Sequence, residues 1–337
     1  MKNARHEFVV GLVSKYPEAP VRQLASIAMQ QGSAWFKSYE DARSSVRYIV
    51  GSRGVFCRKN AAKGPSAHLL RERRKTSVVV SRLPKPWPRW AGSRPFTLAG
   101  PANVLVLQDL HVPFHDQAAI EAALNRGLKE KVDVVLLNGD ICDFYDLSMW
   151  EKDPRQRDFK GEIEAQKQML EEIVRMFAGS RIIFKPGNHE ERYERYLSCK
   201  APELLQLPKF SFASFMEFED MGIELVPERA TVKLGKLHVI HGHEYRFAIQ
   251  NPVSPARGLF LRAKDFATCG HFHQSTQHQG RGISGKVVTC FSSGCLCDLN
   301  PRYLPHNEWS HGFQIVRVER GGGFHMSNLR IIDGKIY

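Results

Sequence analysis

One pattern recurs five times along this chain: a short apolar run that ends directly in side chains able to bind a metal ion. The runs are 104–107 before Asp109 and His111, 134–137 before Asp140 and Asp143, 182–184 before Asn188 and His189, 237–240 before His241 and His243, and the less apolar 265–269 before His271 and His273. Carboxylates, an amide and imidazoles together suit Mn, Fe, Zn and similar divalent ions. The repetition therefore predicts a metal centre assembled from segments that are far apart in the sequence.

Amphipathic stretches alternate with the apolar runs. Residues 116–130 and 160–178 carry apolar side chains at helical spacing, whereas the runs themselves have the length of buried strands. Such alternation is typical of α/β layers, in which ligands gather beyond the carboxyl ends of the strands. We therefore expect the five groups of polar side chains to converge at one edge of a sheet.

The polar groups also follow a known order. D-L-H, G-D-I-C-D, G-N-H-E, H-G-H and G-H-F-H occur in succession over residues 109–273, and this series resembles the motifs of the calcineurin-like metallophosphoesterase superfamily. The later segments S-S-G-C and W-S-H-G-F are similar to phosphoesterases common in phage genomes. The resemblance implies a four-layer α-β-β-α sandwich over residues 101–337.

The resemblance also implies two divalent cations, with Mn favoured and Fe, Zn, Ni or Co as alternatives. It assigns one cation to Asp109, His111, Asp140 and His273, and the other to Asp140, Asn188, His241 and His271. Asp140 would then bridge the pair and take part directly in catalysis. In the family the histidine of G-N-H lies beside the leaving group, which makes His189 the candidate general acid.

Five further residues are candidates near the centre, and four of them have two readings each. Asp143 is a ligand or a group that orients one, and Glu190 would orient the G-N-H loop. Arg192 holds substrate phosphate or is an ordinary surface arginine. His243 and His115 face the pocket or have no part in it.

The reaction implied is phosphoester hydrolysis by in-line attack of a metal-bridging hydroxide. The second motif reads GDICDFY and lacks the phosphate-binding arginine of the protein phosphatases, so the resemblance argues against serine/threonine protein phosphatase activity. We expect a phosphodiesterase acting on nucleic acid. A phosphomonoesterase or a small cyclic-nucleotide phosphodiesterase is the first alternative, and a DNA-binding protein that retains the fold without turnover is the second.

Positive charge is confined to one region. The whole chain has a formal net charge of +13, and residues 1–100 hold 19 Lys/Arg but only 5 Asp/Glu. A local basic block attracts polyanions through counterion release, so residues 1–100 are predicted to bind nucleic acid. A solvated basic linker is the alternative reading.

The same region predicts a separate domain. Apolar spacing indicates helices over 6–17, 20–31 and 38–51, and the segment 51–60 could form a basic wing. We interpret residues 1–60 as a helical domain of helix-turn-helix or winged-helix type, with a cap or a protein-docking element as the alternative. The Pro-rich, basic segment 61–100 is interpreted as a linker.

Location can be inferred only from composition. No apolar run approaches the roughly 20 residues of a membrane span, and the first residues lack a cleavable signal pattern. Seven cysteines without disulfide spacing fit a reduced cytoplasm. Among them, Cys295 and Cys297 are expected to be buried or inert thiols, with ligation of a soft metal as the alternative.

Overall fold

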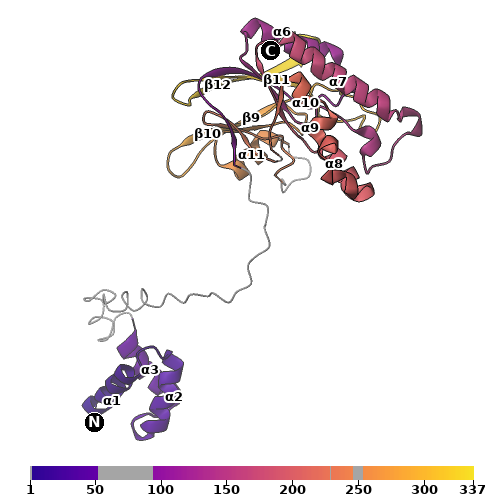
Figure 1. The fold of residues 1–337 in the computed structure, drawn as a ribbon. Helices are drawn as coiled ribbons and strands as arrows, with labels where there is room; N and C mark the ends of the chain where they lie inside the picture. Colours follow the sequence, from indigo (N-terminus) through magenta and orange to yellow (C-terminus); the bar gives the residue numbers. More distant parts are fainter. Residues whose placement is uncertain (1, 52–93, 228, 246–252) are drawn as a thin grey trace. The chain divides into compact units, whose positions relative to one another are not determined.

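The computed structural model describes residues 2–51, 94–227, 229–245 and 253–337. The chain divides into two compact units, Met1–Trp87 and Pro88–Tyr337 (Figure 1). All but the first residue of the predicted wing, 51–60, and most of the predicted linker, 61–100, lie outside the described residues.

The first unit is helical, as expected. Its helices are α1 (Lys2–Lys15), α2 (Val21–Gln31) and α3 (Tyr39–Val50). Ser38 begins α3 by accepting the backbone N–H of Asp41 at 3.3 Å, which satisfies one donor of the first turn. Val9, Leu24 and Val46, one from each helix, are fully or almost fully buried in a common core. The helical character is confirmed, while the nucleic-acid-binding class remains a prediction.

The second unit is built from thirteen strands and six α-helices in its described part. The strands are β1 (Phe96–Leu98), β2 (Ala102–Leu107), β3 (Val134–Asn138), β4 (Arg181–Lys185), β5 (Ile223–Leu225), β6 (Val232–Leu234), β7 (Leu237–Val239), β8 (Ala267–Cys269), β9 (Thr276–Arg281), β10 (Val287–Ser292), β11 (His311–Val318), β12 (Phe324–Ile332) and β13 (Lys335–Ile336). The helices are α6 (Gln117–Glu130), α7 (Phe159–Met176), α8 (Glu191–Lys200), α9 (Phe212–Phe215), α10 (Phe218–Met221) and α11 (Pro255–Ala263). The expected helices over 116–130 and 160–178 are thus α6 and α7.

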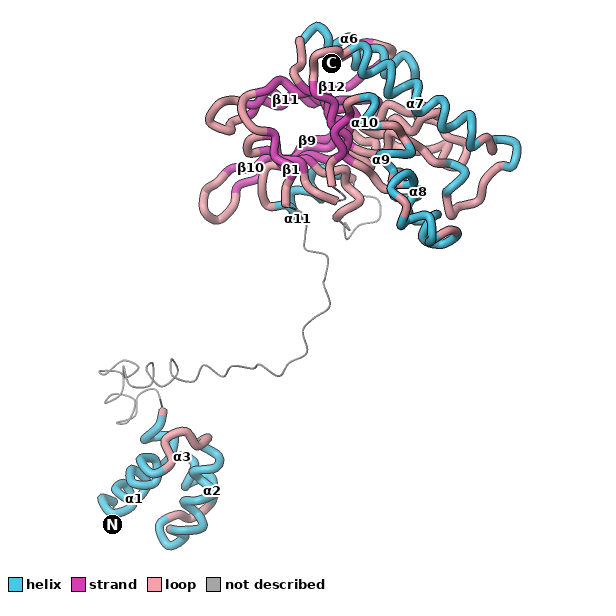
Figure 2. Tube along the Cα trace, in the orientation of Figure 1, coloured by secondary structure: helices cyan, strands magenta, loops and turns pink. Residues whose placement is uncertain are grey.

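The strands form two sheets. The seven-stranded sheet has the order β13-β12-β11-β2-β3-β4-β5, and the six-stranded sheet has the order β1-β6-β7-β8-β10-β9. Figure 2 shows the strands of this unit in magenta. Val104 and Val106 of β2 pack with Val232 and Val239 of the other sheet. These contacts make the two sheets the inner layers of a sandwich.

Helices cover the outer faces. Leu105 of β2 points away from the other sheet and packs in a core that includes Ile120 of α6 and Ile173 of α7. On the far side, Leu259 of α11 packs with Cys269 of β8. Alternation along β2 therefore supplies two different cores, as the period of two in a strand requires. The expected α-β-β-α order of layers is confirmed.

The linker prediction is wrong at its carboxyl end. β1 lies within 61–100, yet it pairs in parallel with β6, and Leu98 is buried between the sheets. The sandwich therefore begins before residue 101. A three-residue strand beside Pro95 has too short a pattern to be separated from a Pro-rich linker by sequence alone.

All five apolar runs are strands, and their order in space explains the convergence. β2, β3 and β4 are parallel neighbours in one sheet, and β7 and β8 are parallel neighbours in the other. The carboxyl ends of neighbouring parallel strands meet at the same edge of a sheet. Among the described residues, no helix has the length and apolar character to cross a membrane.

Candidate metal centre

The predicted ligands stand on unusual backbone. Five of them have positive φ angles between 50° and 67°, in the left-handed region: Asp109, His111, Asp140, His271 and His273. Residues other than glycine adopt this conformation at a cost of roughly 1 kcal/mol or more, and such strain gathers at functional sites. The strand ends are thus held in turns that the ligand side chains themselves do not favour.

The first predicted ligand set is brought together. Nε2 of His111 lies 3.3 Å from Nε2 of His273, which in turn lies 3.4 Å from Oδ1 of Asp109. Oδ2 of Asp140 lies 3.8 Å from Nε2 of His111. All four residues are buried. Donor atoms from the segments that follow β2, β3 and β8 therefore share one small volume.

The second predicted set adjoins the first through Asp140. Oδ2 of Asp140 lies 3.2 Å from Nε2 of His241, and one ligand atom each from Asp140, His241 and His271 falls within 4.8 Å of the others. Asn188 follows β4 and has its Oδ1 buried. The arrangement makes Asp140 common to both sets, as the bridging assignment requires.

The donor atoms fit divalent cations. Within the described residues, Nε2 of His241 and Oδ1 of Asn188 are buried without a hydrogen-bond partner. A buried polar atom without a partner costs about 1–3 kcal/mol, and a cation bound to either atom would remove that cost. The Nε2 atoms of His111 and His273 face each other at 3.3 Å, and one cation could bind both. The residues present thus fit the two predicted ions.

Protonation of the imidazoles differs across the second set. Burial lowers the pKa of His271 to about 4, and the positive charge of His241 acts in the same direction. Burial also opposes the charged form of His241, but the carboxylates of Asp140 and Asp109 raise its pKa to about 10. His271 is therefore ready to bind a cation as the neutral base, whereas His241 must release a proton to do so.

The ligand imidazoles are held from behind. Nδ1 of His241 donates to the carbonyl of Asn138, and Nδ1 of His111 donates to Oδ1 of Asp143, both at 2.9 Å. Each bond fixes the ring so that Nε2 points to the centre. Oδ1 of Asp143 also lies 3.1 Å from Nδ1 of His189. This geometry favours the orienting role of Asp143 over direct ligation.

Glu190 holds the loops that carry Asp140 and Asn188. One carboxylate oxygen accepts the backbone N–H groups of Ile141 and Cys142, each at 2.9 Å. The other accepts those of Asp140 at 3.0 Å and Gly187 at 2.7 Å. Gly187 is required here because an added Cβ would meet Oδ1 of Asp140 at 2.4 Å. Glu190 therefore has the position expected for a loop-orienting carboxylate.

His189 and Arg192 form a pair beside the centre. Nδ1 of His189 donates to the carbonyl of Asp143 at 2.9 Å, and Nη2 of Arg192 donates to Nε2 of His189 at the same distance. Burial disfavours the charged imidazole, but Asp140 and Asp143 outweigh it and raise the pKa of His189. The Arg192 contact requires Nε2 without a proton. A proton and Arg192 therefore compete for the same nitrogen atom.

The two remaining histidines lie outside these ligand groups. Nε2 of His243 donates to Oε1 of Glu191 at 3.1 Å, so its ring is tied to an acidic neighbour. The backbone of His115 forms an isolated bridge with Cys297, and burial lowers the pKa of its side chain. Both residues are close to the motifs in sequence, but neither ring belongs to the two groups of ligand atoms.

Three neighbours of the centre were not found from sequence. Lys185, fully buried, lies 2.5 Å from Oε1 of Glu244, whose carboxylate accepts the N–H groups of His241 and Gly242. The sequence signals for this pair were a lysine at the end of an apolar strand and a glutamate directly after H-G-H.

The third neighbour is Trp309, whose ring centroid lies 4.1 Å from that of His273. Its sequence signal was the segment W-S-H-G-F, which begins with this tryptophan.

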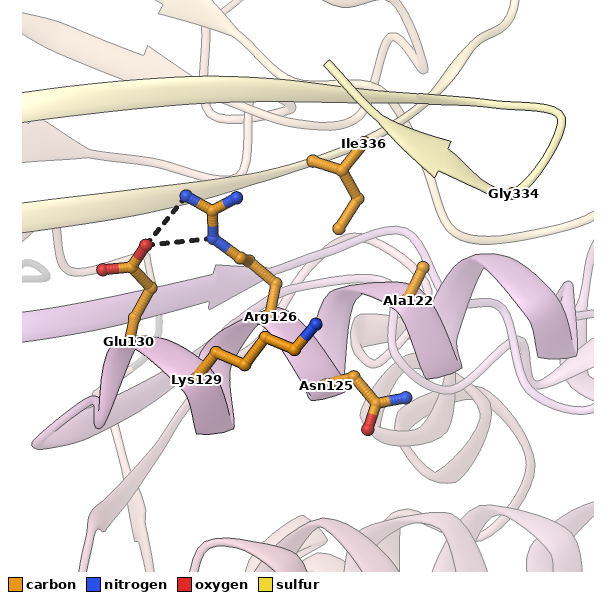
Figure 3. Close-up of a pocket in the computed structure, with 7 residues that line it drawn as sticks. All are labelled: Ala122, Asn125, Arg126, Lys129, Glu130, Gly334 and Ile336. Carbon is orange, nitrogen blue, oxygen red and sulfur yellow. Dashed lines mark hydrogen bonds and ion pairs between the residues drawn. The ribbon is translucent and has the colours of Figure 1, made fainter.

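Figure 3 shows a surface pocket between α6 and the turn that ends in β13. Its lining is Ala122, Asn125, Arg126, Lys129, Glu130, Gly334 and Ile336. Arg126 and Glu130 are paired with each other at 2.8 Å. This lining contains none of the predicted site residues, so the chemistry is assigned to the metal centre and not to this pocket.

Comparison with known proteins agrees with the motif series. Residues 102–275 match the family described as calcineurin-like phosphoesterase. No curated protein sequence matches the chain.

Solved structures give weaker similarities. A Vps29 single mutant from Entamoeba histolytica is 16% identical, with a TM-score of 0.36, over 70% of this chain and 96% of that one. Vacuolar protein sorting 29 from Cryptosporidium parvum is 15% identical, with a TM-score of 0.37, over 71% and 96%. The phosphoesterase Yfce from E. coli is 15% identical, with a TM-score of 0.31, over 67% and 98%.

Proposed function

The chain belongs to the calcineurin-like phosphoesterase family, and we propose that it is a two-metal phosphodiesterase whose substrate is nucleic acid. The observation that carries the proposal is the sharing of Asp140 between two groups of buried donor atoms. All seven predicted ligands are present in the sequence, which supports turnover over a binding role that merely retains the fold.

The protein's part in the reaction is to hold and orient. Asp109, His111, Asp140 and His273 would bind one cation, and Asp140 with Asn188, His241 and His271 would bind the other. Two such cations, Mn being the proposed identity, lower the pKa of water and neutralise charge on a phosphoryl group.

His189 is proposed as the group that protonates the leaving oxygen. Its Nδ1 is fixed by Asp143, so the proton available for transfer is the one on Nε2. The raised pKa keeps this imidazole charged toward neutral pH, which suits a general acid. A leaving oxygen would have to take the place of Arg192 at Nε2, and the displaced guanidinium could then bind a phosphate oxygen.

The nucleic-acid part of the proposal rests on charge. Residues 1–100 carry the whole positive excess of the protein, and a phosphodiester polymer is the partner that gains most from it. Within the described helices of the first unit, Arg5 and Arg43 are already paired with Asp41 and Glu40. We therefore assign most of the attraction to the remaining basic side chains of residues 1–100.

One substrate panel tests the proposal. The full chain with Mn(II) is offered single-stranded DNA, duplex DNA, bis-p-nitrophenyl phosphate and p-nitrophenyl phosphate. We expect cleavage of DNA and of the model diester. Cleavage of the model diester without cleavage of either DNA would refute the nucleic-acid substrate, and cleavage of the monoester alone would refute the diesterase.

The role of His189 has its own test. His189→Asn should lower kcat/KM roughly 10²- to 10⁴-fold for a diester with an alkyl leaving group, because such an oxygen needs the proton. The loss for a p-nitrophenyl leaving group should be far smaller. His243→Asn is the matched control, since that imidazole lies nearby but is tied to Glu191. Equal losses for both leaving groups would show that His189 is not the acid.

A further inference from the structure

The segment 293–310 joins β10 to β11 (Figure 1). Its last residues are fixed to a predicted ligand, because the backbone N–H of Ser310 donates to the carbonyl of His273 at 2.8 Å. Near its start, the N–H of Asp298 donates to the carbonyl of Phe114 at 2.9 Å. The segment 298–310 is thus anchored at both ends close to the β2 and β8 loops.

Two aromatic rings of this segment continue outward from the centre. The ring of Trp309 lies 4.1 Å from that of His273, and the ring of Tyr303 lies 6.4 Å from that of Trp309, both centroid to centroid. Trp309 is half-buried, whereas Tyr303 is 80% exposed. We call Tyr303 and Trp309 the aromatic pair. An exposed large ring two contacts away from a predicted ligand is well placed to meet a substrate.

The aromatic pair is held in position before any substrate arrives. Nδ2 of Asn307 donates to the carbonyls of Leu299 and Leu304, and Oδ1 of Asn307 accepts the backbone N–H of Trp309. Next to Tyr303, the guanidinium of Arg302 pairs with Asp153 of a neighbouring loop at 2.9 Å. Pre-ordering lowers the entropy cost of binding a flat group against these rings.

We propose that the aromatic pair stacks a nucleobase of the substrate while the adjoining phosphate lies at the metal centre. This inference rests on the proposed function and narrows it to phosphoesters that carry a base. Aromatic rings bind bases of any identity by stacking, because every base has a π face. The exposed cation of Arg302, next to Tyr303 in the sequence, and the cation of Arg192 beside the centre suit the negative backbone of such a substrate.

The test measures binding and does not need turnover. Isothermal titration calorimetry of the full chain with Mn(II) compares thymidine 5′-monophosphate with methyl phosphate, which has the same phosphate but no base. The wild type should bind the nucleotide more tightly. Tyr303→Ala should lower nucleotide affinity roughly five- to a hundredfold, the effect of losing one base stack, and leave methyl phosphate unchanged.

Two variants control the result. Tyr303→Phe keeps the ring and should keep the preference for the nucleotide. Tyr337→Ala removes another exposed tyrosine ring, outside the aromatic pair, and should leave nucleotide affinity unchanged. Equal affinity of the wild type for both ligands, or a preference that survives in Tyr303→Ala, would overturn the proposal. If the base preference holds but no diester in the substrate panel is cleaved, the aromatic pair stands and the proposed function fails.

Discussion

Replacing Glu190 by glutamine should destabilise the second unit far more than its single-atom change suggests. Each carboxylate oxygen of Glu190 accepts two backbone N–H groups, from Ile141 and Cys142 on one side and from Asp140 and Gly187 on the other. A glutamine has only one acceptor oxygen. Whichever way the amide is turned, two N–H donors lose their acceptor and face an NH₂ group.

The cost follows from those two lost bonds. A hydrogen bond to a charged group contributes about 1.5–3 kcal/mol, so Glu190→Gln should lower the free energy of unfolding by about 3–6 kcal/mol. Burial and the charge of Asp140 raise the pKa of Glu190, which reduces the benefit of its charged form and favours the lower part of that range. For a unit of this size each kcal/mol corresponds to about 2–4 °C in Tm.

Thermal and urea unfolding with EDTA present would measure this loss without a contribution from bound metal. Glu224→Gln is the matched control, since Glu224 on β5 makes a partly exposed pair with Arg181 and should cost less than about 1 kcal/mol. A Glu190→Gln protein within about 1 kcal/mol of the wild type would refute the view that this carboxylate organises the two loops.

Three further perturbations have clear expected outcomes. Asp140→Asn should reduce bound metal from about two ions per chain toward none, as measured by elemental analysis, with the circular dichroism spectrum retained. Burial raises the pKa of Glu162 from 4.5 to about 7, so folding binds a proton in that interval and stability falls as pH rises through it. Glu162→Gln should therefore match the wild type at about pH 5 and exceed it by up to about 3 kcal/mol at about pH 8, by urea unfolding at both values. Deleting residues 1–93 should abolish salt-sensitive DNA binding in a filter or gel assay but leave hydrolysis of bis-p-nitrophenyl phosphate intact; unchanged DNA affinity would contradict the charge argument.

The sequence was most informative where a short pattern encodes both burial and chemistry. The run before Asp109 shows four consecutive apolar residues and then a donor, and this is enough to predict a buried strand that ends at a site. The helix beginning at Ser38 was equally predictable, because the cap and the apolar period lie within a few residues of each other.

Features that depend on distant contacts were not predictable. Lys185 looked like the polar end of a strand, and only the fold brings it to Glu244, 59 residues away. β1 has three residues, and its identity as a strand comes from its pairing with β6. Likewise, nothing in the residue types of His271 or His273 indicates a left-handed backbone, which the surrounding turns impose.

The ligand positions are divided between the two sheets: Asp109, Asp140 and Asn188 follow strands of one, while His241 and His271 follow strands of the other. A filled centre would consequently cross-link the sandwich at one edge, in the manner of a non-covalent staple. Stripping the ions should then speed amide hydrogen exchange first at the ends of β7 and β8, long before the interior of the sandwich responds.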